Sequence, residues 1–170
     1  MKTRTFIAIG ILAASLFSCT GLSYLPESDT IDTNRYGSYI HVKIRDGGDA
    51  KGELLAADGK DLFVLNKDTT QQKILKIPFG NVERFKLRYA KPKHYGWTIP
   101  VSIAVTVAHG WYSGITAPVN LATTTSVTLG GEEAFTYNER TMPLYKIRMF
   151  ARFPQGMPSN VDLARIRVKY

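Results

Sequence analysis

Three strands and two tight turns are predicted in the stretch YIHVKIRDGGDAKGELLAADGKDLFVLN, residues 39–66. At its start Ile40, Val42 and Ile44 alternate with polar residues, which is the period of a half-buried strand. The two turns, DGGD and DGKD, are built from residues that tolerate positive φ. This stretch therefore predicts an antiparallel meander with one buried face.

The pattern continues beyond residue 66 with two more short strands, separated by a break at residues 78–81 (PFGN) that suits one tight helical turn. Five short strands with tight turns in about 55 residues predict a small, strongly bent antiparallel barrel. The predicted strands cover residues 39–45, 51–57, 62–65, 73–77 and 82–89.

Part of this region contains Val42, Ile44, Asp46 and Gly47, followed by Gly52, Leu54 and Asp58. This pattern resembles the first motif of Sm-like barrels. The resemblance implies a five-stranded SH3/Sm-like barrel over residues 36–94, in which Gly52 bends the second strand. The Arg-Gly signature of the second Sm motif is missing from the sequence, so the resemblance implies architecture and no RNA-binding residues.

The N-terminus has the features of a secretory signal peptide. Lys2 and Arg4 precede an uninterrupted run of apolar and small residues at 6–16. Eleven helical residues rise about 16 Å, too little for a hydrocarbon core of about 30 Å. Residues 1–18 are therefore predicted to be a signal peptide.

The run ends in Leu16-Phe17-Ser18-Cys19, which resembles the lipobox of bacterial lipoproteins. The resemblance implies that the chain is cleaved before Cys19 and that this cysteine carries a palmitate-type lipid anchor. Thr20, in place of an aspartate, favours the outer membrane by analogy with enterobacterial lipoproteins. The whole layout also resembles envelope lipoproteins of the Bacteroidetes type.

Composition and charge narrow the class of protein. The chain has 170 residues, one cysteine and a formal net charge of +8. A single cysteine excludes an intramolecular disulfide framework. Cleavage before Cys19 leaves 20 basic against 14 acidic side chains, a net charge of +6. Because an envelope location keeps the chain away from nucleic acid, we expect no nucleic-acid partner.

Residues 19–35 are polar and aperiodic, and we expect them to be a tether.

Residues 95–131 contain no Asp, Glu, Lys or Arg. Apolar residues alternate with small residues over 101–108, as in a strand, while Gly110 and Gly114 have the spacing that lets two helices pack closely. Three structures remain open: an apolar helical hairpin on the barrel or a membrane surface, extra strands, or a single membrane span. We expect this segment to pack on the barrel, on the membrane or on an envelope protein partner.

The last segment, residues 132–170, is basic, and we expect it to pack on the barrel. Residues 141–152 suit a helix that begins at Pro143, although alternation over 145–153 supports a strand as well. Residues 163–170 have the pattern of an edge strand. The predicted fold class is mainly β with some α (α+β).

No motif for catalysis or metal binding is present. His41, His94 and His109 have no partners at metal-ligand spacing, and the residues around Ser113 do not form the G-x-S-x-G nucleophile motif. The two Asp-Gly turns do not have the spacing of a twelve-residue calcium loop. We therefore expect a non-enzymatic protein without cofactor or metal.

The sequence thus predicts a membrane-anchored envelope lipoprotein that serves as a structural or protein-interaction module. The alternative is a module that binds a polyanion or glycan, such as lipopolysaccharide or a cell-wall polymer, through a basic barrel face. The candidate residues for that face are Lys43, Arg45, Arg84, Lys86 and Arg88.

Overall fold

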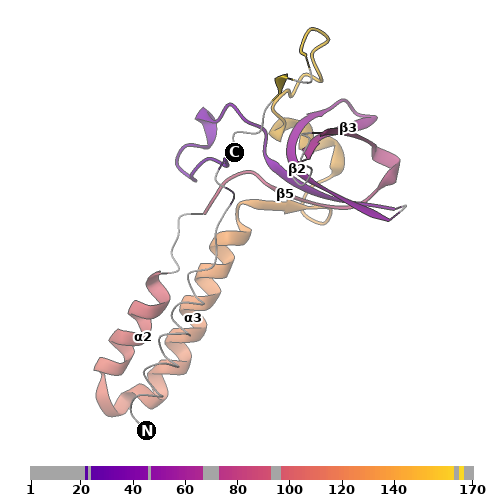
Figure 1. Cartoon of the computed structure of the whole chain (residues 1–170). Coiled ribbons are helices and arrows are strands. Elements are labelled where there is room, and N and C mark those ends of the chain that lie inside the picture. The colour runs from indigo at the N-terminus through magenta and orange to yellow at the C-terminus, as the bar shows by residue number, and fades with distance from the viewer. Residues whose placement is uncertain are drawn as a thin grey trace. The chain divides into compact units, whose positions relative to one another are not determined.

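The structure is a computed structural model. It describes residues 22, 24–45, 47–66, 73–92, 97–162, 165 and 166. They form two compact units (Figure 1). The sheet unit combines Leu22–Lys91 with Phe135–Tyr170, and the hairpin unit contains Pro92–Ala134. In the chain, the hairpin unit is therefore an insertion into the sheet unit.

A six-stranded antiparallel sheet forms the sheet unit, in the order β4-β3-β2-β1-β5-β6. The first five strands confirm the predicted ones, and the predicted break is the 3-10 turn η2 (Phe79–Asn81). The strands are β1 (Tyr39–Ile44), β2 (Gly48–Ala57), β3 (Asp61–Asn66), β4 (Lys73–Pro78), β5 (Val82–Arg88) and β6 (Thr136–Asn138).

The expected closed five-stranded SH3/Sm-like barrel is wrong. The sheet is open, with β4 and β6 as its two edges. β6 pairs with β5 through Lys86 with Asn138, Leu87 with Tyr137 and Arg88 with Thr136. It thus occupies the edge of β5 that would have to pair with β4 to close a barrel of five strands. The broader α+β class agrees with the structure.

Strand β2 is ten residues long because it pairs with two neighbours in succession. Residues 48–53 pair with β1 and residues 52–57 pair with β3, so Gly52 lies where the two pairings overlap. A Cβ at Gly52 would lie 1.8 Å from the carbonyl oxygen of Leu65. Glycine is therefore needed here for the close approach of β3, and the register shift of β2 lies further on, between Leu54 and Ala56.

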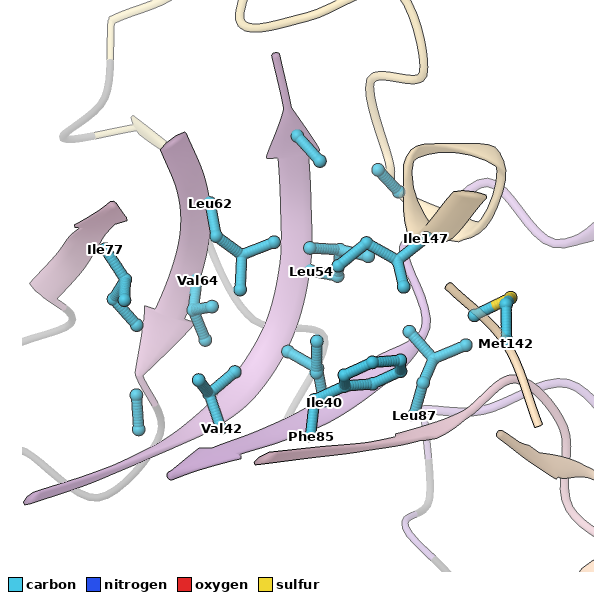
Figure 2. Close-up of a cluster of buried hydrophobic side chains, with 13 residues drawn as sticks. Ile40, Val42, Leu54, Leu62, Val64, Ile77, Phe85, Leu87, Met142 and Ile147 are labelled. Atoms are coloured by element: carbon cyan, nitrogen blue, oxygen red, sulfur yellow. The ribbon is translucent and has the colours of Figure 1, made fainter. Parts of the chain in front are cut away.

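The main core lies on one face of the sheet and is covered by the 3-10 segment η5 (Leu144–Phe150). Ile147 of η5 is fully buried, and Figure 2 shows its side chain beside that of Leu54 and above that of Leu87. Full burial of one such side chain stabilises the fold by about 1.5–3 kcal/mol. The other labelled members of this core are Ile40, Val42, Leu62, Val64, Ile77, Phe85 and Met142.

Segments that precede β1 and segments that follow the hairpin in the sequence complete the sheet unit. Tyr24 and Leu25 are buried, so the described part of the expected tether contributes two core side chains. In the C-terminal segment, the 3-10 segment η5 lies where a helix or a strand was expected, and the unexpected strand β6 precedes it. The segment also makes an isolated bridge between Ala56 and Phe153. The edge strand expected at 163–170 lies outside the described residues except for 165 and 166.

The hairpin unit is helical. It consists of α2 (Thr98–Ala108), the 3-10 turn η4 (Gly110–Tyr112) and α3 (Ser113–Glu133). Gly110, at the reversal between the helices, has a φ of +60°, a left-handed conformation that favours glycine. Of the three structures that the sequence left open for this segment, the structure has the helical hairpin.

Candidate functional site

Basic side chains gather on the face of β1 and β5 that is turned away from the main core. Side chains alternate along β5, so Phe85 is buried while Arg84 and Lys86 are exposed. In the register of β1 with β5, Lys43 pairs with Arg84 and His41 pairs with Lys86. Directly opposed residues have Cβ atoms about 4.5–5.5 Å apart. Two cross-strand pairs therefore bring these groups together.

A shallow hollow of about 280 Å³ lies over these pairs, and we call it the basic hollow. One acid faces it: Oε2 of Glu139 accepts a hydrogen bond from the backbone N–H of Phe85 at 3.4 Å. The basic hollow therefore offers cations and one carboxylate to a ligand. Its lining residues are His41, Lys43, Arg84, Phe85, Lys86, Asn138 and Glu139.

The cations of this face are only partly paired. Asp49 Oδ2 lies 3.2 Å from His41 Nε2 and 4.0 Å from Lys51 Nζ. Within the described residues, no carboxylate lies within 4.0 Å of the ammonium groups of Lys43 or Lys86. Among the residues that the structure describes, these two ammonium groups therefore have no ion-pair partner.

Of the five predicted basic residues, the structure brings Lys43, Arg84 and Lys86 together in the basic hollow. Arg45 follows β1, and its backbone N–H donates to the carbonyl of Asn81 at 2.9 Å. Arg88 pairs with Tyr39 at the far end of β1. Neither Arg45 nor Arg88 lines the hollow.

A buried ion pair, Glu53 with Arg152, joins β2 to the C-terminal segment. Nε of Arg152 lies 2.6 Å from Oε1 of Glu53, and Nη2 lies 2.7 Å from Oε2. The backbone N–H of Gly37 donates to Oε1 at 2.9 Å. Burial raises the pKa of Glu53, and Arg152 offsets part of that shift. No sequence signal indicates this pair, because its members are 99 residues apart.

A second hollow, of about 290 Å³, lies beside this ion pair within the sheet unit. The guanidinium carbons of Arg152 and Arg35 lie 4.9 and 5.4 Å from the ring centroid of Tyr36. Tyr89 and Phe150, whose ring centroids are 5.4 Å apart, line the same hollow. The sequence did not indicate this site, since its residues come from three distant segments. Arg152 is already paired with Glu53, so the geometry here is that of a structural junction.

The hairpin is the other surface with unusual chemistry. Trp111 at the tip is 97% exposed, and Tyr112 beside it is also exposed. Large exposed apolar patches on soluble domains mark interaction sites. The large apolar side chains that the two helices and their ends expose are Trp97, Val101, Ile103, Val105, Val107, Trp111, Tyr112, Ile115, Val119, Leu121, Val127 and Leu129.

Polar side chains fill the seam between α2 and α3. Thr106, only 3% exposed, accepts a hydrogen bond at Oγ1 from Asn120 Nδ2 at 3.1 Å. Thr124 Oγ1 donates to Ser102 Oγ at 3.1 Å. The hairpin thus has polar groups inside and apolar groups outside, the reverse of a helix pair in a soluble domain. The sequence indicated this surface through its missing charges, but not the inward position of the hydroxyls.

The residues screened for catalysis have structural contacts. His109 Nδ1 lies 2.8 Å from the carbonyl oxygen of Val105, one turn earlier in α2. In the second Asp-Gly turn, hydrogen bonds from the backbone N–H groups of Asp61 and Lys60 lower the pKa of Asp58. Among the described residues, no three His, Cys, Asp or Glu side chains are grouped so that they could hold a metal ion. His94 and Cys19 lie outside the described residues.

Within the part of the chain that the structure describes, neither α2 nor α3 has the length and apolar character required of a membrane-crossing helix. In comparisons with protein families, curated proteins and solved structures, nothing matches this chain.

Proposed function

We propose that this chain is a lipid-anchored envelope lipoprotein that acts as a non-enzymatic interaction module. The exposed apolar surface of the hairpin carries the proposal, because a domain without a partner would not present so many large apolar side chains to water. The lipobox at residues 16–19 supports attachment through Cys19. A diacylglycerol on this cysteine supplies the two acyl chains that stable anchoring requires.

The anchor is tested by metabolic labelling with palmitate. Wild-type protein is expected to be labelled and to fractionate with the outer membrane, while Cys19→Ala loses the label and accumulates with its signal peptide attached. Ser18→Ala is the matched control, since it keeps a small residue before the cysteine. Unchanged labelling of Cys19→Ala would contradict the proposal.

The interaction role is tested by crosslinking the acylated protein in native membranes. We expect the hairpin to be crosslinked to a component of the envelope membrane, either a lipid or a protein, and we expect this crosslink to be lost when residues 97–130 are deleted. Retention of the same component by the deletion variant would assign the interaction to the sheet unit instead.

The basic hollow favours a second candidate function, which is binding of a polyanion such as the phosphates of lipopolysaccharide. The supporting observation is that Lys43 and Lys86, which have no ion pair in the described part of the chain, lie in one hollow with Arg84. Cations grouped in this way attract phosphate in a salt-dependent manner.

This second function is tested by retention on immobilised lipopolysaccharide. The triple variant Lys43→Glu, Arg84→Glu and Lys86→Glu is expected to lose retention. The control triple variant Lys60→Glu, Lys146→Glu and Arg148→Glu changes the net charge equally at exposed positions outside the hollow. Equal loss in both variants would show that net charge, and not the hollow, is responsible.

A further inference from the structure

The apolar surface of the hairpin extends around its helices instead of forming one stripe. Successive residues of an α-helix are about 100° apart. In α2, therefore, Val101 and Val105 lie on one flank of the polar seam, while Ile103 and Val107 lie on the other. All four are exposed. A protein groove covers one stripe of a helix, whereas lipid chains surround it on every open side.

The absence of charged side chains in the hairpin also points to lipid as the material that surrounds it. Residues 95–131 contain no ionisable carboxylate, ammonium or guanidinium group. Interfaces between proteins normally carry a polar, charged rim around an apolar centre. The acyl region of a bilayer makes every charge costly and rewards a surface without any.

Several hydroxyl groups of the hairpin are already hydrogen-bonded within it, which lowers the cost of placing them in lipid. Thr106, Thr116, Thr123 and Thr128 each donate to the carbonyl oxygen four residues earlier, at 2.7–3.1 Å. In a bilayer, every polar group has to find its partner inside the protein. These four threonines meet that requirement.

Aromatic residues mark the depth at which the hairpin would lie. Trp97 precedes α2, and Trp111 and Tyr112 follow it; all three are exposed. Trp and Tyr favour the headgroup level, where the ring is in apolar surroundings and its polar group is hydrated. With such residues at both of its ends, α2 is suited to lie along the membrane surface.

We propose that the charge-free part of the hairpin, residues 97–131, is a lipid-binding element that lies within one leaflet of a bilayer with Trp97 and Trp111 at headgroup depth. This inference rests on the proposed anchoring through Cys19, which would hold the hairpin beside the same bilayer. It gives the molecule a second, protein-encoded membrane contact.

The test uses the two tryptophans, which are the only ones in the chain and both lie in the hairpin. The full acylated protein is reconstituted into phosphatidylcholine vesicles whose acyl chains carry bromine, a quencher of tryptophan emission. We expect blue-shifted emission that is strongly quenched. The variant Trp97→Phe isolates Trp111, which we expect to be quenched most by bromine near the headgroups.

A charged side chain on the apolar surface of the hairpin should remove the quenching of tryptophan by brominated lipid. Val119→Lys places an ammonium at an exposed position of α3 and is expected to abolish quenching of Trp111. Met149→Lys is the matched control, because Met149 is exposed to a similar degree but belongs to the sheet unit. It is expected to leave quenching unchanged.

Vesicle-bound protein with unquenched, water-like emission would overturn the inference and leave the anchor intact. Emission that is blue-shifted in native envelope membranes but not in the protein-free vesicles would also overturn it, and would assign the hairpin to a protein partner. Failure of the proposed anchoring is seen separately, as absence of palmitate on Cys19.

Discussion

The hydroxyl of Tyr24 is a buried polar group in the sheet unit. The side chain is 2% exposed, and its oxygen has no hydrogen-bond partner in the part of the chain that the structure describes. A buried polar group left without a partner costs about 1–3 kcal/mol. We therefore predict that Tyr24→Phe increases the free energy of unfolding by about 1 kcal/mol or more. Urea denaturation measures this, and a less stable variant would show that the hydroxyl is needed.

The same residue makes the protein sensitive to alkali. Burial, followed by the nearby charge of Glu53, raises the pKa of Tyr24 above its usual value of 10.0. The unfolded chain then loses this proton above about pH 10 while the folded chain keeps it, so stability falls with rising pH by up to about 1.4 kcal/mol per unit. We predict that Tyr24→Phe reduces this slope. Equal slopes in urea titrations of both proteins at alkaline pH would contradict the assignment.

The ion pair of Glu53 with Arg152 gives a third prediction at this scale. Removing Arg152 leaves a fully buried carboxylate, which costs about 3–5 kcal/mol. It also raises the pKa of Glu53 further, so stability falls as pH rises above the ordinary carboxyl value of 4.5. Arg152→Met should therefore be much less stable at neutral pH and recover part of the loss in acid.

The matched control is the double variant Glu53→Gln with Arg152→Met, in which no buried charge remains. Because this variant has no ionisable group at the site, its free energy of unfolding is expected to lack the fall from acid to neutral pH that Arg152→Met shows. A single variant that is equally destabilised at both pH values would indicate that Glu53 is neutral in the folded protein.

At the scale of single elements, the β2–β3 pair depends on one glycine. A Cβ at Gly52 would overlap the carbonyl of Leu65, so Gly52→Ala must separate the strands. We predict a loss of about 1–3 kcal/mol, as in other overpacked sites, with a lower midpoint in urea. Gly48→Ala, on the same strand, is the control, since a Cβ there meets nothing within 4 Å. If both substitutions had similar effects, the loss of stability would be due to the conformational preference of alanine in a strand and not to the close approach of β3.

Local patterns in the sequence predicted the first five strands, but they could not predict the pairing of β6 with β5, which are far apart in the sequence. The alternation of Ile40, Val42 and Ile44 locates β1 because a half-buried strand leaves that pattern in any context. β6 has only three residues and no such pattern. It pairs with β5, which lies far from it in the sequence: Arg88 and its partner Thr136 are 48 residues apart. The prediction of a closed barrel was wrong because no local pattern in the sequence showed that β6 occupies the edge of β5.

The candidate surfaces were predictable to different extents. Alternation along β5 placed Arg84 and Lys86 on one face, but only the register with β1 shows that Lys43 joins them. The Glu53–Arg152 pair leaves no local pattern in the sequence. For the hairpin, the missing charges indicated an unusual surface, while the inward hydroxyls required the pairing of Thr106 with Asn120.

In the whole molecule, all 22 Lys and Arg and all 14 Asp and Glu lie outside residues 95–131. The two proposed contacts therefore differ in the force that drives them. The basic hollow would act through charge, whereas the hairpin would act through apolar burial. Salt separates the two, because the Debye length falls from about 10 Å at 0.1 M to about 3 Å at 1 M, while apolar burial is not screened.

We accordingly predict opposite responses to an increase in salt over this range. Retention on lipopolysaccharide should fall, whereas quenching of Trp111 by brominated phosphatidylcholine should be unchanged. The hairpin variant Val119→Lys should keep salt-sensitive retention, and the variant Lys43→Glu, Arg84→Glu and Lys86→Glu should keep quenching. Loss of quenching in high salt would mean that charges outside the hairpin hold it at the membrane, and salt-independent retention would remove the basic hollow as a polyanion site.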